Sequence, residues 1–85
     1  MGNSKRMLNW TMKIVKSFRG ESFTSHHVTD RWGDYASERY KPNTLAISAL
    51  LRKLEGRGLI RKTGARRRYS NFSGSTEKAL YYKEV

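Results

Sequence analysis

Apolar residues recur at helical spacing in three stretches of the chain. In the first stretch, about residues 4–19, they lie three or four positions apart and therefore occupy one face of a helix. That face carries Leu8, Thr11, Met12, Val15 and Phe18. Asn3 or Ser4 can cap the start of this helix, and Gly20 can end it in a left-handed turn.

The second stretch, about residues 25–38, follows a short extended piece at Phe23 and begins at Thr24 or Ser25, either of which can cap a helix. Its predicted buried face consists of Val28, Trp32 and Tyr35. Gly33 lies inside this pattern, and glycine disfavours the interior of a helix. The helix therefore either stops at Gly33 or continues to about Arg39.

The third stretch, about residues 43–56, has the clearest helical pattern. A proline stands just before it, Asn43 can cap it, and Gly56 and Gly58 follow its last apolar residue. Its apolar stripe consists of Ile47, Leu50, Leu51 and Leu54. We expect this stripe to face the core and the rest of the helix to face outward.

Two segments near the end of the chain are rich in residues that favour strands. They are "LIRKT", residues 59–63, and "ALYYKEV", residues 79–85. The intervening "GARRRYSNFSGST" has no aliphatic run, so we expect a long irregular loop between two strands that pair as an antiparallel hairpin. The predicted fold is α+β: three helices, a short strand between the first two, and a C-terminal hairpin over about residues 59–85.

The composition indicates one small basic domain. The 85 residues include 18 Lys and Arg against seven Asp and Glu, a formal net charge of +11. A positive field of this size favours a polyanion as the partner. No apolar stretch reaches the length of a membrane span or of a signal-peptide core. We therefore expect a soluble chain without a membrane partner, located in the cytoplasm with the nucleoid or in the nucleus and not secreted.

Residues suited to metal or catalytic chemistry are sparse. The chain has no cysteine, and its two histidines, His26 and His27, are adjacent, so on a helix they point about 100° apart and do not readily share a metal. We expect them to be surface or cap residues. The seven acidic residues are scattered rather than clustered for a metal-assisted or general-base reaction. These patterns predict no metal, no cofactor and no enzymatic activity.

The outer face of the third predicted helix is unusual for a solvated surface, because its only charges are positive. It consists of Leu45, Ser48, Ala49 and Arg52, flanked by Lys41 and Lys53. Small side chains allow close approach, a hydroxyl can meet a base edge, leucine can meet a thymine methyl, and arginine can bind guanine or phosphate. This face fits a DNA major groove. The alternative is that another protein element, a longer second helix or a dimer partner, packs on it.

Six basic residues and no acidic residue lie between positions 57 and 68. Cations that pair with phosphates release counterions, so such a run favours salt-dependent binding to nucleic acid. We expect at least two of Arg66, Arg67 and Arg68 to contact phosphates or a minor groove. The alternative is a solvated, disordered loop. Tyr69 and Phe72 either stack on bases or pack the hairpin against the body.

The segment "TLAISALLRKLEGRGLIRKT", residues 44–63, resembles the recognition helix and first wing strand of winged helix-turn-helix proteins. In that superfamily a helix with this Leu-Glu ending leads through Leu-Ile into a hairpin called the wing. The resemblance implies that the third helix contacts bases through Asn43, Thr44, Leu45, Ser48, Ala49 and Arg52. It also implies contacts to the DNA backbone from Lys41, Lys53, Arg61, Lys62, Arg66, Arg67, Arg68 and Tyr69.

One segment departs from the pattern of that superfamily. The connection "GDYASERYK", residues 33–41, is longer than the turn of a tight helix-turn-helix. Either the second helix is extended or an extra turn is inserted between the second and third helices. The longer connection affects the position of the second helix relative to the third helix, which it supports.

The charge, the outer helix face and the resemblance together predict sequence-specific binding of double-stranded DNA by a small transcriptional regulator, as a monomer or as a homodimer. Two alternatives keep the same fold. One is a winged helix that binds RNA or single strands through the aromatic residues of the wing. The other is a winged helix whose positive surface docks an acidic protein.

Overall fold

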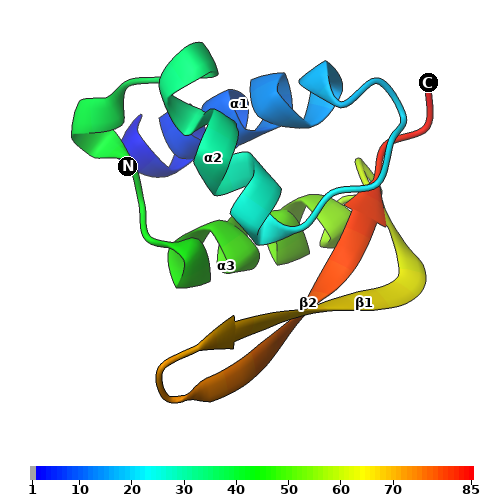
Figure 1. The fold of residues 1–85 in the computed structure, drawn as a ribbon. Helices are drawn as coiled ribbons and strands as arrows, with labels where there is room; N and C mark the ends of the chain where they lie inside the picture. Colours follow the sequence, from blue (N-terminus) through cyan, green and yellow to red (C-terminus); the bar gives the residue numbers. More distant parts are fainter. Residues whose placement is uncertain (1) are drawn as a thin grey trace.

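The computed structural model describes residues 2–85, apart from the side chains of residues 2–4 and 71. Three α-helices are followed by a two-stranded antiparallel hairpin (Figure 1). The elements are α1 (Gly2–Ser17), α2 (Ser25–Tyr35), the 3-10 helix η1 (Glu38–Tyr40), α3 (Thr44–Gly56), β1 (Arg61–Asn71) and β2 (Gly74–Tyr82). The predicted α+β class, with three helices and a C-terminal hairpin, is confirmed.

The helix α1 begins and ends earlier than its predicted range of residues 4–19. The side chains of its predicted caps, Asn3 and Ser4, lie outside the described residues. Arg19 and Gly20 follow the helix with φ angles of 52° and 88°, which is the left-handed turn predicted at Gly20.

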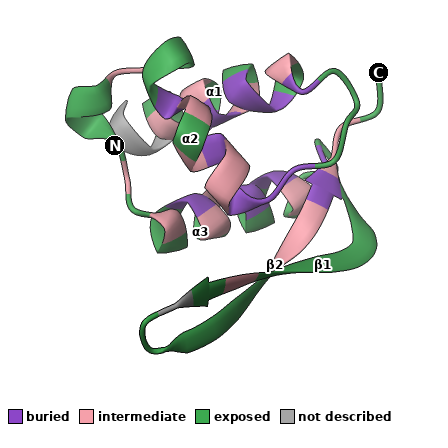
Figure 2. Ribbon diagram, viewed as in Figure 1, coloured by how far each residue is buried: buried purple, intermediate pink, exposed green. Residues whose placement is uncertain are grey.

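The core lies where the three helices meet the base of the hairpin (Figure 2). Its buried apolar residues are Leu8, Ile14, Val15, Phe18, Phe23, Val28, Trp32, Ile47, Leu51, Leu54, Ile60 and Tyr81. In α1, Ile14 was not predicted to be buried and Met12 is only half-buried. Because α1 packs against both α2 and α3, its buried face is wider than one stripe. Within residues 2–85, no helix is both long and apolar enough to cross a membrane.

The second helix ends between the two predicted limits. Val28 and Trp32 are buried as expected, but Tyr35 is 43% exposed, so its predicted burial is wrong. The physical reason is that Tyr35 is the last residue of α2, and the backbone becomes extended at Ala36, which packs against the core in its place. The Trp32 indole Nε1 donates a hydrogen bond to the Ser37 carbonyl at 3.0 Å and fixes this exit. The extra turn considered for the connection is η1.

The third helix follows its predicted pattern closely. The Asn43 side chain accepts a hydrogen bond from the Ala46 backbone N–H at 2.8 Å, which is the predicted cap. Ile47, Leu51 and Leu54 are buried, and Leu50 is half-buried at the edge of the same stripe. The buried stripe therefore determines which face of α3 is left in solvent.

The segment "GARRRYSNFSGST" is not the predicted long irregular loop, because β1 and β2 extend through most of it. Arg66 pairs with Ala79, and regular pairing continues to Asn71 and Gly74, so only Phe72 and Ser73 form the turn. An exposed hairpin is held by backbone pairing and cross-strand contacts and needs no aliphatic run of its own. Gly64, with φ 89°, lies in the irregularity between Lys62 and Arg66.

The base of the hairpin is fastened to the helices by a backbone bridge. Phe23 and Tyr81 exchange two N–H···O hydrogen bonds of 2.8 Å. The short strand predicted near Phe23 is therefore reduced to a single bridge residue beside β2. The rest of the hairpin projects past α3 and is mostly exposed (Figures 1 and 2).

Candidate functional site

A hollow of about 290 Å³ lies between the outer face of α3 and the hairpin. Leu45 forms its apolar rim on α3, and the buried core residue Tyr81 lies at its base. Its charged and hydroxyl lining includes Ser48, Arg52, Lys62, Arg66, Glu77 and Lys78. Four cations face one carboxylate in this set, so the hollow is a positively charged site for an anionic group.

Most of the outer face of α3 is exposed, and among the described residues only Lys78 makes a hydrogen bond to it. Leu45 is 72% exposed, and Ala49 and Arg52 are also exposed. Ser48 is half-buried because Lys78 of β2 reaches across, with 3.5 Å between Lys78 Nζ and Ser48 Oγ. A longer second helix does not cover this face, since α2 ends at Tyr35. The small residues are therefore available for contact with another molecule.

The first residues of α3 have mixed accessibility. Asn43 is exposed, but its amide oxygen is engaged in capping the helix, so its amide nitrogen remains as a donor. Thr44 is half-buried. These two residues lie at the end of the exposed face and outside the hollow.

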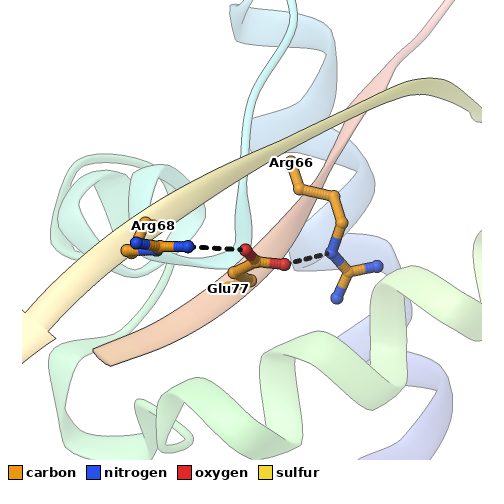
Figure 3. Close-up of polar contacts among 3 residues, drawn as sticks. All are labelled: Arg66, Arg68 and Glu77. Carbon is orange, nitrogen blue, oxygen red and sulfur yellow. Dashed lines mark hydrogen bonds and ion pairs between the residues drawn. The ribbon is translucent and has the colours of Figure 1, made fainter. Parts of the chain in front are cut away.

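Glu77 holds two of the three consecutive arginines (Figure 3). Its carboxylate oxygens lie 3.1 Å from Arg66 Nε and 3.5 Å from Arg68 Nη2. All three side chains are about half exposed or more, so each pair contributes at most about 1 kcal/mol to stability. The contacts align both guanidinium groups on one side of the hairpin, where phosphates can replace the carboxylate.

Arg67 and Tyr69 alternate with Arg66 and Arg68 and therefore point to the other face of the hairpin. The Tyr69 ring stacks on His26, with 3.9 Å between centroids, and its hydroxyl lies 2.7 Å from Thr24 Oγ1. The guanidinium of Arg67 lies 5.2 Å from the Tyr69 ring centroid. Of the two alternatives for Tyr69, packing of the hairpin against the body is the one observed. Phe72, at the turn, is fully exposed.

His27 faces two hydrogen-bond donors, but its neutral ring has only one acceptor nitrogen. Its Nδ1 accepts a hydrogen bond from the Thr24 backbone N–H at 3.0 Å, and its Nε2 lies 3.1 Å from Arg67 Nη1. A guanidinium only donates, so a neutral imidazole that accepts from Thr24 carries its proton on Nε2 and cannot also accept from Arg67. Burial, reinforced by the Arg67 charge, lowers the pKa of His27 below 6.5. The second contact is therefore weak, and Arg67 can turn to a phosphate.

Five of the seven predicted backbone-contacting cations do not line the hollow: Arg67 and Arg68 on the hairpin, and Lys41, Lys53 and Arg61 elsewhere. Lys41 is 3.8 Å from Glu38, and Arg61 is 3.3 Å from Glu84. Lys53 is exposed on the flank of α3. The structure therefore brings together Leu45, Ser48, Arg52, Lys62 and Arg66, but not the whole predicted set.

Several residues at the site were not predicted. Lys78 lies in the hairpin but was not singled out, and its position over Ser48 depends on the register of β1 with β2. Ser25 is buried and lines the hollow, and its hydroxyl has no hydrogen-bond partner among the described residues. His26 and His27 were expected as surface or cap residues, and His27 does cap α2. Within the described chain, no group of three or more His, Cys, Asp or Glu side chains is arranged to hold a metal ion.

Comparison of the chain with protein-family models, with curated proteins and with solved structures finds no match.

Proposed function

We propose that the chain is a winged-helix protein that binds double-stranded DNA sequence-specifically, as a small transcriptional regulator. The observation that carries the proposal is the hollow in which the uncovered face of α3 and the cationic hairpin meet. An α-helix fits the major groove, and a basic hairpin beside it can follow the adjacent phosphates.

The two sides of the hollow have different roles in this proposal. On α3, Ser48, Ala49 and Arg52 meet base edges, and Leu45 meets a thymine methyl. On the hairpin, the arginines bind phosphates and supply affinity that does not depend on sequence. Lys78 lies beside Ser48 and joins the two sides.

DNA binding replaces the contacts of Glu77. A phosphate that reaches Arg66 or Arg68 competes with one carboxylate that both arginines share. Because this carboxylate is exposed, its displacement costs little free energy. In the free protein, the Glu77 contacts therefore orient the two arginines without preventing them from binding a phosphate.

The experiment that tests the proposal is selection from random duplexes, followed by affinity measurements at several salt concentrations. Arg52→Ala is expected to reduce discrimination at one base position by about 1–3 kcal/mol. Arg66→Ala is expected to weaken binding to all duplexes alike and to reduce the salt slope by about 0.9. Arg57→Ala, an exposed arginine after α3 and outside the hollow, is the matched control. Unchanged binding in both Arg52→Ala and Arg66→Ala would contradict the proposal.

A second candidate function, binding of single-stranded nucleic acid, is favoured by one observation. Phe72 is fully exposed at the turn of the hairpin, where its ring is free of the body and can stack on an unpaired base. Competition between duplex DNA, single-stranded DNA and structured RNA separates the candidates. Preference for a single strand, together with a loss of at least about 1 kcal/mol in Phe72→Ala, would favour this second function. The mass of the complex measured in the same experiment distinguishes a monomer from a homodimer.

A further inference from the structure

The solvent face of α1 is a second cationic surface, separate from the hollow. It consists of Lys5, Arg6, Asn9, Lys13 and Lys16. At 100° per residue, these positions lie on the side of the helix opposite to the buried Leu8, Thr11 and Val15. A shallow groove of about 620 Å³ runs along this face, and the half-buried Trp10 and Met12 also contribute to its lining.

The cations of this face form no ion pair with the described part of the chain. Residues 1–20 contain no aspartate or glutamate. The ion pairs among the described residues join side chains of the η1 region and the hairpin, and none involves α1. The hairpin arginines share a carboxylate, whereas the α1 lysines have none. The α1 face therefore presents its full charge to solvent.

The α1 face and the hollow point in different directions. In Figure 1, α1 lies along the upper side of the helical part, α3 lies along the lower side, and α2 crosses between them. The buried side of α1 packs on α2 and α3, so its solvent face is turned away from α3 and from the hairpin beyond it. A duplex bound in the hollow leaves the α1 face open.

We propose that the solvent face of α1 binds the phosphate backbone of a second duplex, so that one molecule bridges two DNA segments. The inference rests on the proposed function, since the first duplex occupies the hollow. From Lys5 to Lys16 the face spans about 16 Å, at 1.5 Å per residue, which covers several phosphates of a duplex that carries one charge per about 1.7 Å. The surface contains no base-reading set comparable to α3, so this contact is independent of sequence.

Two other occupants fit the face less well. A helix that binds a membrane surface inserts an exposed apolar face, but the apolar side of α1 is buried in the core. A second copy of the chain would bring like charges together across a symmetric contact. A polyanion with regularly spaced charges matches the face without either difficulty.

The bridging test uses one duplex fixed to beads and a second, labelled duplex in solution. The full chain is expected to recover the labelled duplex at protein concentrations that leave part of the DNA free. Lys5→Gln/Lys13→Gln/Lys16→Gln is expected to reduce recovery at least about tenfold, because each lost phosphate contact removes about 0.9 from the salt slope. The same variant is expected to bind a single labelled duplex within about threefold of the unchanged chain, since the hollow is intact.

The matched control removes three positive charges elsewhere. Arg39→Gln/Arg57→Gln/Lys83→Gln has the same change of net charge, and none of its three positions lines the α1 groove or the hollow. It is expected to retain bridging. Circular dichroism checks that both variants remain folded, and the single reversal Lys13→Glu, at an exposed position, provides an independent variant.

The outcomes separate the bridging inference from the proposed function. If the full chain binds one duplex but recovers no second duplex, bridging is wrong and DNA binding stands. If it binds no duplex, both are wrong.

The variants have outcomes of their own. If the two triple variants lose bridging equally, the loss is due to net charge, and the bridging proposal is wrong. A complex containing two protein chains, with bridging unchanged in the α1 variant, would assign bridging to dimerisation. Binding of the α1 face to anionic lipid vesicles, without a second duplex, would also overturn it.

Discussion

The two sides of the hollow are held in position by different forces. On one side, α3 is fixed by Ile47, Leu51 and Leu54, which are fully or almost fully buried. On the other side, none of the described side chains in the outer part of the hairpin is buried. Its contacts with the helices are polar or aromatic, and they include Tyr69 with Thr24 and His26, Arg67 with His27, and Lys78 with Ser48. One surface is therefore part of the core packing, and the other is attached to it.

This difference determines how each side responds to its surroundings. Apolar packing involves no charge that salt can screen or acid can titrate, so the position of α3 is expected to change only when the whole domain unfolds. Exposed ion pairs and single hydrogen bonds contribute about 1 kcal/mol each, so the outer hairpin can detach by itself. A surface that reads bases needs the first kind of support, whereas a phosphate-binding surface tolerates the second.

The largest expected effect is on the α3 side. Leu51→Ala removes a fully buried side chain and is expected to lower the free energy of unfolding by about 2–5 kcal/mol. Leu45→Ala makes the same chemical change on the opposite, exposed face of the same helix, and its expected effect is within about 0.5 kcal/mol. Urea denaturation followed by circular dichroism measures both. Equal destabilisation by the two substitutions would mean that the outer face of α3 is covered in solution.

The next effect is local to the hairpin. Tyr69→Ala removes the stack on His26 and the hydroxyl contact with Thr24, so the amides of residues 66–71 are expected to exchange faster with solvent while those of α3 do not. Its expected cost is about 1–2 kcal/mol, and Tyr69→Phe, which keeps the ring, is expected to cost about half as much. Hydrogen exchange measured residue by residue checks both. Phe72→Ala is the control, since the Phe72 side chain is fully exposed.

A uniform increase of exchange over α3 and the hairpin in Tyr69→Ala would contradict this prediction. It would mean that the outer hairpin and the helices open together. The α3 side and the hairpin side of the hollow would then unfold as one cooperative unit.

The sequence predicted the α3 side well because the signals that form it are local. A capping Asn43 and aliphatic residues at helical spacing determine both the helix and its outward face. The wrong prediction at Tyr35 is also local in origin: the helical pattern of apolar residues continues to the last residue of the helix, where the backbone becomes extended and the side chain is no longer held against the core.

The hairpin side was predicted less well because its structure depends on distant residues. The part of β1 from Gly64 to Asn71 has no aliphatic run, yet it forms a strand because β2 pairs with it. The partner of Tyr69 lies at Thr24, far away along the chain, and no spacing rule identifies such a contact. Likewise, the roles of Glu77 and Lys78 depend on a register that the sequence alone does not determine.

A smaller effect is expected at the start of α3. Asn43→Ala removes the cap on Ala46 and is expected to lower the free energy of unfolding by about 1 kcal/mol, whereas Asn43→Ser keeps a capping oxygen and is expected to restore most of it. Denaturation curves of the two variants give the difference. If Asn43→Ala leaves stability unchanged, the start of α3 is held by the chain before it rather than by the side-chain cap.

The smallest effect is a pH dependence of the hairpin attachment. The pKa of His27 lies below its ordinary value of 6.5 because of burial and the Arg67 charge, although Asp30 acts in the opposite direction and Arg31 and His26 add to the lowering. Below pH 6.5 the unfolded chain therefore binds a proton more readily than the folded one, so stability falls as the pH drops, down to the folded-state pKa.

A variant at His27 tests whether acid weakens the attachment of the hairpin to α2, while leaving α3 in place. His27→Gln keeps an acceptor for the Thr24 N–H and cannot titrate, so its melting temperature is expected to fall less than that of the unchanged chain between pH 7 and pH 5. Amide exchange is expected to increase first around Tyr69 in the unchanged chain, because a charged His27 repels Arg67 on the same face. If the melting temperatures of both chains fall equally between pH 7 and pH 5, other groups cause the acid sensitivity, and the hairpin attachment does not depend on pH.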